Sequence, residues 1–331
     1  MTAPTIDQVL QRLRKAQRVA IFTHQRPDPD ALGSQAAAGV ILHRLGATTI
    51  TLLHFAEPPK PYMFLQKNVA AESIVFTDTW AAGPGADLDT ILVVDTCTYN
   101  QLEPAAAFLK AHHQKVVAID HHLTRDDLGP LVYADTNAAA CVEILWELSR
   151  HAGIAMDAQL ALPLMSGLVA DTGWFRFDSV KPRTHLMAAD LTPHVNNSQL
   201  YEKLMQTETR PKLSLMQRAL ASLRWTSADR FACMILTQKD FTDTGAIQSQ
   251  TEYLVDLPMI VSTVEVVALM TEMPDGKIRA SLRSKHEVDV NAICKNFNGG
   301  GHAKAAGCRF DAPLDRAYDQ LAAAVSTAIG A

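Results

Sequence analysis

RVAIFTHQRPDPDALGSQAAAGVILHRLG, residues 18–46, is the stretch that decides the fold. Its first six residues, RVAIFT, are mostly apolar and rich in β-branched side chains, without clean alternation, which is typical of a strand buried on both faces of a parallel sheet. A polar loop with two prolines follows, and 31–46 then has the composition of a helix. Strand, loop and helix in this order predict the first unit of an α/β fold.

Three more runs predict strands of the same sheet, at 48–55, 90–95 and 115–120. We predict an N-terminal α/β domain over 1–192, with helices on both faces of a parallel sheet, as the catalytic metal-binding domain. A helical connector over 193–224 follows. Runs at 231–237, 264–273 and 276–284, the latter two joined by an Asp275-Gly276 turn, predict a smaller α+β domain with a mixed sheet over 225–331.

Composition limits the classes of function. The formal net charge of −5 argues against a protein that grips long duplex nucleic acid, because such binding needs many phosphate contacts from Lys and Arg. The first residues show no export signal, and apolar runs fall short of the ~18 residues of a membrane span. The five cysteines lack C-x-x-C spacing, which favours a reducing cytoplasm over a disulfide framework.

Acidic and histidine side chains stand where the predicted strands end. His24 follows the first strand, Asp95 the third, and Asp120, His121 and His122 the fourth. Ligands of open α/β sheets bind at the carboxyl ends of strands, so these residues should converge. The loop after the first strand adds Asp28 and Asp30, and Asp171 ends a later helical run. Unpaired carboxylates would repel one another, and a cation removes that conflict.

The donor types indicate which metal to expect. Histidine nitrogens and carboxylate oxygens without a thiolate favour Mn²⁺, with Mg²⁺ or Co²⁺ as alternatives, over structural zinc. The number of donors suffices for two ions that share one carboxylate. Two such ions can clamp a phosphoryl group and activate water, so the sequence predicts a two-metal phosphohydrolase.

These residues carry a resemblance to a known family. The segment His24-Gln25-Arg26-Pro27-Asp28-Pro29-Asp30, Asp95, the run Asp120-His121-His122, and Asp171 resemble the four motifs of the DHH phosphoesterase superfamily. Gly299-Gly300-Gly301-His302, with 281–285 before it and 305–307 after it, resembles the domain associated with DHH proteins. The resemblance covers nearly the whole chain and is nearest to the NrnA-type oligoribonuclease and 3'-phosphoadenosine 5'-phosphate (pAp) phosphatase branch.

The resemblance implies a role for each residue. One ion would be held by His24, Asp28 and Asp95, and the other by Asp30, Asp95, His121 and Asp171. Asp120 would orient the histidine pair, and His122 would contact the phosphate or protonate the leaving oxygen. Arg283, His302 and the backbone of Gly299, Gly300 and Gly301 would bind a terminal phosphate or nucleotide.

The same resemblance implies the substrates. We expect cleavage of RNA from dinucleotides to pentanucleotides into 5'-mononucleotides, and conversion of pAp to AMP, by a protein that needs no membrane and is compatible with a homodimer. The alternatives are a phosphodiesterase for cyclic di-AMP or linear dinucleotides and, less favoured, a non-catalytic nucleotide sensor. Two departures stand out: Pro29 replaces a glycine usual in relatives, and the stretch after Asp95 lacks a common arginine.

Overall fold

The computed structural model describes residues 4–67, 74–77 and 87–330. The chain divides into two compact units, unit 1 over Met1–Thr207 and unit 2 over Glu208–Ala331. The predicted connector over 193–224 is thereby shared: helix α8 (Asn197–Met205) falls in unit 1 and helix α9 (Arg210–Ala221) in unit 2. No described helix is both long and apolar enough to cross a membrane.

Unit 1 is built on a parallel sheet, as predicted. Its strand order is β3-β2-β1-β4-β5-β6, and every neighbouring pair is parallel. The order reverses between β1 and β4, which is the switch point where open α/β sheets place their ligands. The strands are β1 (Arg18–Phe22), β2 (Thr49–Leu53), β3 (Ile74–Thr77), β4 (Thr90–Val94), β5 (Val116–Asp120) and β6 (Leu131–Ala134).

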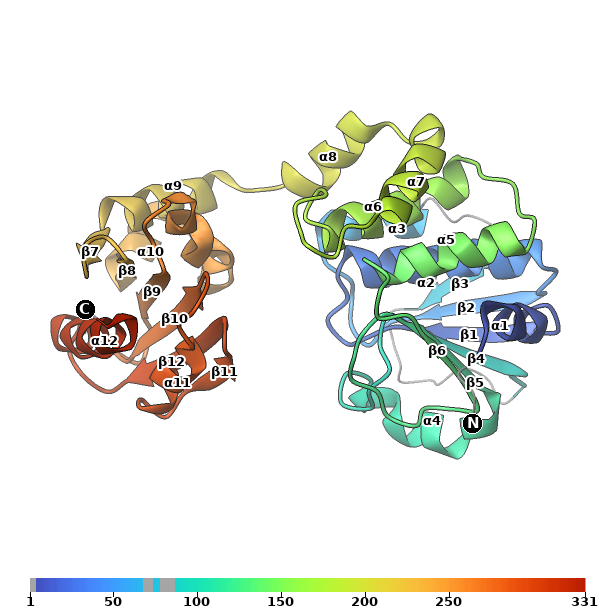
Figure 1. Cartoon of the computed structure of the whole chain (residues 1–331), viewed down its shortest axis with the longest axis horizontal. Helices are drawn as coiled ribbons and strands as arrows, with labels where there is room; N and C mark the ends of the chain where they lie inside the picture. Colours follow the sequence, from blue (N-terminus) through green and yellow to red (C-terminus); the bar gives the residue numbers. More distant parts are fainter. Residues whose placement is uncertain (1–3, 68–73, 78–86, 331) are drawn as a thin grey trace. The chain divides into compact units, whose positions relative to one another are not determined.

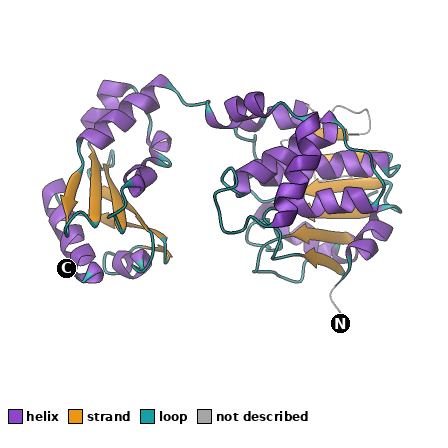
Figure 2. Ribbon diagram, turned by 45° about the horizontal axis from the view of Figure 1, so that its top comes forward, coloured by secondary structure: helices purple, strands orange, loops and turns teal. Residues whose placement is uncertain are grey.

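Helices cover both faces of this sheet (Figures 1 and 2). One core packs α1, α2, α5 and α6 against one face, and a second core packs α4 against the other. The bounds are α1 (Ile6–Leu13), α2 (Pro29–Arg44), α3 (Phe64–Lys67), α4 (Ala106–Ala111), α5 (Cys141–His151), α6 (Ala158–Asp171) and α7 (Pro182–Leu191). Short 3₁₀ turns lie at Lys60–Tyr62, Glu103–Ala105, His113–Lys115 and Thr192–His194.

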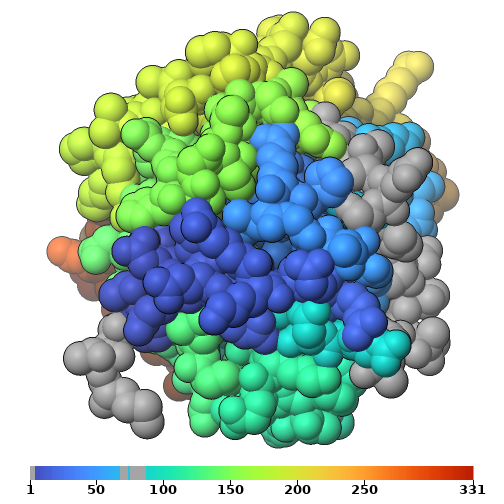
Figure 3. Space-filling model, turned by 90° about the vertical axis from the view of Figure 1, so that its right-hand side faces the viewer, coloured from blue at the N-terminus to red at the C-terminus, as the bar shows by residue number. Residues whose placement is uncertain are grey.

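Local sequence signals set several helix starts. Thr5 and Gln8 form a capping box at the start of α1. Asp28 caps α2, and Pro29 takes its first helical position, where the missing N–H costs nothing, so the departure from glycine is accommodated there. Figure 3 shows that the N-terminal segment (dark blue) shares one face of unit 1 with chain from much later in the sequence (teal to green).

Unit 2 contains the predicted mixed sheet. Its order is β11-β12-β10-β9-β8-β7, with β8 and β9 parallel and the other pairs antiparallel. The strands are β7 (Arg224–Thr226), β8 (Phe231–Leu236), β9 (Val266–Glu272), β10 (Ile278–Ser284), β11 (Gly300–His302) and β12 (Ala305–Phe310). The helices are α9, α10 (Gln238–Thr244), α11 (Val290–Lys295) and α12 (Leu314–Ile329), with 3₁₀ segments at Gln248–Thr251 and Leu254–Ile260.

Most of the glycine segment of unit 2 belongs to the sheet. Gly300–His302 forms the edge strand β11, hydrogen-bonded to β12. A side chain at Gly299 would meet the carbonyl oxygen of Gly307 at 2.3 Å, and Gly301 has φ 151° with Ala305 O 2.5 Å from where its Cβ would stand. These glycines are therefore required by close packing of two strands as well as by backbone conformation.

Candidate active site

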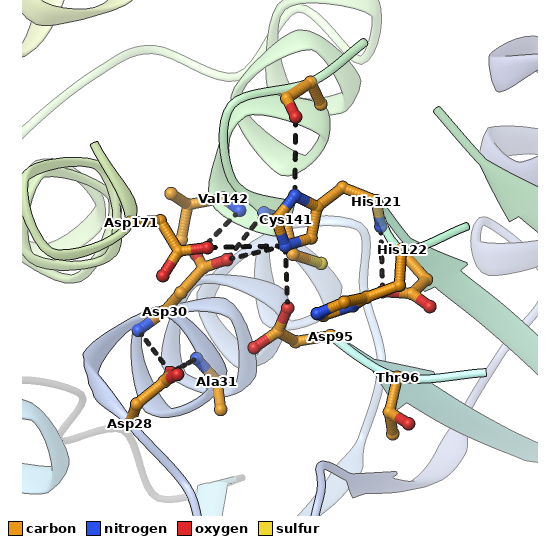
Figure 4. A network of polar contacts seen from close by, with 12 residues as sticks. Asp28, Asp30, Ala31, Asp95, Thr96, His121, His122, Cys141, Val142 and Asp171 are labelled. Atoms are coloured by element: carbon orange, nitrogen blue, oxygen red, sulfur yellow. Dashed lines mark hydrogen bonds and ion pairs between the residues drawn. The ribbon is translucent and has the colours of Figure 1, made fainter. Parts of the chain in front are cut away.

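The predicted metal-binding residues of unit 1 do come together, and Figure 4 shows all of them except His24. β1, β4 and β5 are neighbours in the sheet, so His24, Asp95 and the Asp120-His121-His122 run leave it at the same edge. Asp28 and Asp30 stand at the start of α2, and Asp171 ends α6. Within this group, the donor atoms of His24, Asp28 and Asp95 lie within 4.8 Å of one another, as do those of Asp30, His121 and Asp171.

Asp95 occupies the centre of the cluster. Its Oδ2 is 3.5 Å from His24 Nε2, and its Oδ1 is 3.5 Å from His121 Nε2. Its backbone has φ 61°, a left-handed conformation that aspartate tolerates better than most residues. The carboxylate thus turns back toward both histidines directly after the strand, as the shared ligand of two ions would have to do.

Backbone groups fix two of the other side chains. Asp30 accepts hydrogen bonds from the amides of Cys141 at 2.6 Å and Val142 at 3.1 Å, at the start of α5. The Nδ1 of His121 lies 3.3 Å from the carbonyl oxygen of Ala138. A proton on Nδ1 leaves Nε2 free for a metal, and Nε2 is the atom that faces Asp171 Oδ2 at 3.4 Å.

The segment 138–142, which provides these backbone groups, was missed by the sequence analysis. It contains no polar side chain, so only its place at the start of α5 could have indicated the role.

Asp120 and His122 form a hydrogen-bonded pair at the side of the cluster, and a ring nitrogen of His122 also lies within 4.8 Å of donor atoms of Asp95 and His121. The buried Asp120 Oδ1 accepts from His122 Nδ1 at 2.7 Å and from the His121 amide at 2.8 Å. The His122 ring is half exposed, so its Nε2 edge is open to a ligand. This geometry suits a histidine that is oriented by a carboxylate and that donates a proton from its other nitrogen.

The pKa values of the cluster show negative charges that an ion would compensate. Burial and the neighbouring carboxylates Asp95 and Asp28 raise the pKa of Asp171 to about 7. Burial also raises the pKa of Asp30 well above its usual range, as do Asp95 and Asp171. Burial alone would lower the pKa of His121, but Asp95 and Asp171 raise it to about 9. Protons thus occupy the positions at which a cation would neutralise the same charges.

The donor set passes a simple test for a metal. In the part of the chain that the structure describes, Asp95 Oδ1 and His121 Nε2 are buried without a hydrogen-bond partner. Buried polar atoms left in this way are costly unless something coordinates them. Nitrogen and carboxylate oxygen donors fit Mn²⁺ or a similar divalent ion, so the cluster is a candidate metal centre.

The remaining predicted residues lie in unit 2. Arg283 is on β10, and His302 is on β11 at the end of the glycine segment. Ala305 of β12 lies directly opposite His302 on one side and Arg283 on the other. His302 and Arg283 therefore project from the same face of the sheet, with Ala305 between them.

Comparison with known proteins agrees with these observations. The model of the DHH family, N-terminal domain, matches residues 18–168, and the DHHA1 domain model matches 234–331. Asp171 lies just beyond the first match.

Two named relatives align over most of the chain. The probable bifunctional oligoribonuclease and PAP phosphatase NrnA of Streptococcus mutans is 27% identical, over 90% of this chain and 91% of its own. The bifunctional oligoribonuclease and PAP phosphatase NrnA of Thermus thermophilus is 29% identical, over 93% of this chain and 89% of its own.

A solved structure shares the fold. An exopolyphosphatase-related protein from Bacteroides fragilis superposes with a TM-score of 0.82 at 21% identity, covering 97% of this chain and 95% of its own. With both domains matched in order, and the histidines and carboxylates of the first gathered at one sheet edge, the chain belongs to the DHH family of metal-dependent phosphoesterases.

Proposed function

We propose that the protein hydrolyses RNA fragments from dinucleotides to pentanucleotides into 5'-mononucleotides, and pAp into AMP and phosphate, with two bound Mn²⁺ ions. The observation that carries the proposal is the pair of donor groups that meet at Asp95. The names of the two relatives support the choice of substrates. The cytoplasm is the proposed compartment, in line with five cysteines that are all buried and free.

The proposed ligand sets follow the geometry of the cluster. His24, Asp28 and Asp95 hold one ion, and Asp30, Asp95, His121 and Asp171 hold the other. When bound, the two ions would supply a clamp on the phosphoryl oxygens and an activated water. Asp30 is held by the start of α5 and His121 by Ala138, so both ligands are oriented before an ion arrives.

His122 is the proposed general acid. Asp120 accepts the hydrogen bond from Nδ1 of the ring and raises the pKa of His122, which favours the protonated form that a general acid needs. The proton on Nε2 is transferred to the 3'-oxygen as that oxygen leaves. Arg283, His302 and the backbone of Gly299, Gly300 and Gly301 are the proposed contacts to the substrate's terminal phosphate.

The first test is turnover of pApA, pAp, cyclic di-AMP and a 24-nucleotide RNA by purified protein, in Mn²⁺ and in EDTA. We expect Mn²⁺-dependent release of AMP from pApA and pAp and little from the long RNA. Faster cleavage of cyclic di-AMP would establish the cyclic dinucleotide alternative instead. Tight dinucleotide binding without any turnover would establish a sensor.

A variant of His122 tests the general acid, and a substrate without its 5'-phosphate tests the terminal-phosphate contacts. His122→Ala should lower turnover by about 10²- to 10⁴-fold, the usual contribution of a general acid. His113→Ala is the control, because His113 pairs with the exposed Asp127 and neither residue belongs to the donor groups of the cluster. Omission of the 5'-phosphate, ApA in place of pApA, should raise KM, and equal KM values would contradict the terminal-phosphate contacts.

A further inference from the structure

One face of the unit 2 sheet is covered only in part. The core beneath α9 and α10 includes residues of β8 and β9, but among the described residues it includes none from β10, β11 or β12. The side chains of β10 that point to this face are Arg279, Ser281 and Arg283, while Ile278, Ala280 and Leu282 pack into the opposite core. Three consecutive outward positions of β10 are thus polar and accessible.

A cavity of about 330 Å³ lies against this face. Leu269 and Thr271 of β9 contribute to its lining, with Arg279, Ser281 and Arg283 of β10 beside them. Tyr253, in the segment between the two 3₁₀ turns, also lines it. We call this cavity the arginine pocket. Its volume is within the range of small-molecule sites, and it lies entirely within unit 2.

Two arginines face each other beside the pocket. Arg279 of β10 lies directly opposite Arg309 of β12, and both side chains are exposed. Like charges at directly opposed positions destabilise a sheet. Neither arginine makes an ion pair within the described ranges, whereas Arg283 has Asp256 at 3.6 Å. The two guanidinium groups repel each other, and an anion bound by both would remove that repulsion.

Tyr253 adds an aromatic surface in an unusual conformation. Its backbone has φ 65°, and its side chain is 70% exposed. A left-handed conformation is unfavourable for a bulky residue, and such strain is concentrated at functional positions. An exposed aromatic ring beside arginines is the combination that proteins use to bind single-stranded nucleic acid, the ring stacking on a base and the cations binding phosphates.

We propose that the arginine pocket binds one nucleotide of an oligonucleotide substrate, with its base stacked on Tyr253 and its phosphate held by Arg279 and Arg309. Arg283 stands four residues from Arg279, about 14 Å along the strand, so the face can bind two separate phosphates. This inference rests on the proposed function for the identity of the substrate. It adds a nucleotide subsite to the terminal-phosphate contacts proposed for Arg283 and His302.

The experiment measures binding of pApApA by calorimetry to the full chain in EDTA, where no metal-dependent turnover takes place. Tyr253→Gly removes the ring and suits the left-handed backbone, so its melting temperature should not fall. We expect its Kd to rise about 5- to 150-fold, the range for loss of one base stack. Tyr253→Phe keeps the ring and should bind within about twofold of the unmodified chain.

The arginines are tested by salt dependence. Because Arg279 and Arg309 hold the same phosphate, the double variant Arg279→Gln, Arg309→Gln should make the slope of log K against log salt shallower by about 0.7, the value for one phosphate contact in a single strand. Arg224→Gln is the matched control, because Arg224 lies at the other edge of the same sheet and pairs with Asp315. Its Kd and slope should be unchanged.

Three results would overturn the proposal: unchanged binding by Tyr253→Gly, equal loss in Tyr253→Phe, or no binding of pApApA by the unmodified chain in EDTA. The proposed function is judged separately. If the chain binds pApApA in EDTA with these variant effects but shows no Mn²⁺-dependent hydrolysis, the result would support the arginine pocket and contradict the proposed function.

Discussion

The two units bury acidic side chains in opposite ways. In unit 1, Asp30 and Asp95 lie among other carboxylates, and even two backbone hydrogen bonds leave the pKa of Asp30 high. In unit 2, the buried Glu265 accepts hydrogen bonds from three successive amides, those of His286, Glu287 and Val288. The buried negative charge in unit 1 is not compensated without a cation, whereas the charge of Glu265 is compensated by the backbone amides. The contrast implies large effects where a buried carboxylate is changed and small effects where an exposed ion pair is changed.

Asp95→Asn should have the largest effect. Asparagine keeps the left-handed backbone at φ 61° but removes the charge shared by the two donor groups. We expect Mn²⁺-dependent hydrolysis of pApA to fall by at least about a thousandfold, or about 4 kcal/mol. Initial rates measure it, and circular dichroism checks the fold. The exposed Asp87→Asn is the control, and a variant at 95 with normal rates would show that the cluster is not the catalytic centre.

Mn²⁺ should stabilise unit 1 and leave unit 2 unchanged. At a hundred times its Kd, a ligand that binds only the folded state adds about 2.7 kcal/mol. Hydrogen exchange should therefore slow in β1, β4 and β5 and stay the same in β8, β9 and β10. Equal protection of both units would contradict a metal centre confined to unit 1, and Asp95→Asn should abolish the difference.

Glu265→Gln should destabilise unit 2 by about 2 kcal/mol, within the range for a buried charged acceptor. Burial would raise the pKa of Glu265, but the three amide hydrogen bonds lower it. The stabilisation is therefore complete above the unfolded pKa of about 4.3 and is lost as pH falls through the lower folded value. Hydrogen exchange in β9 and β10 at pH 7 and at acidic pH measures it. A pH-independent difference between the two proteins would argue against this explanation.

Arg224→Gln should have the smallest effect. Its ion pair with Asp315 joins two solvent-exposed side chains 3.3 Å apart, and such pairs contribute less than about 1 kcal/mol. Chemical denaturation followed by the signal of unit 2 measures the change. If Arg224→Gln lowered the free energy of unfolding as much as Glu265→Gln, burial would not explain which charge interactions in this unit are strong.

The sequence predicted those features that depend on single segments. Strands β1, β4 and β5 are buried on both faces, so their apolar runs are continuous and the polar residue that ends each run is easily recognised. The six donor residues at these ends and on α2 and α6 were named without the structure. Their grouping follows from the neighbouring positions of three parallel strands.

Other features depend on pairing between distant segments and could not be predicted in this way. β6 is only half buried, and β7 and β11 are three-residue strands without an apolar run. The opposition of Arg279 and Arg309 exists only in the β10–β12 register. The boundary near Thr207 falls inside one polar helical stretch, where contacts rather than composition separate α8 from α9.

The left-handed backbone of Asp95 also has an evolutionary consequence. Glycine and asparagine are the residues that adopt this conformation most readily besides aspartate, and neither carries a negative charge. Glutamate keeps the charge but not the conformational preference. No single substitution satisfies both demands, so any change at Asp95 loses either the negative charge or the backbone preference. A carboxylate on an ordinary helix or strand can instead change from aspartate to glutamate without that conflict.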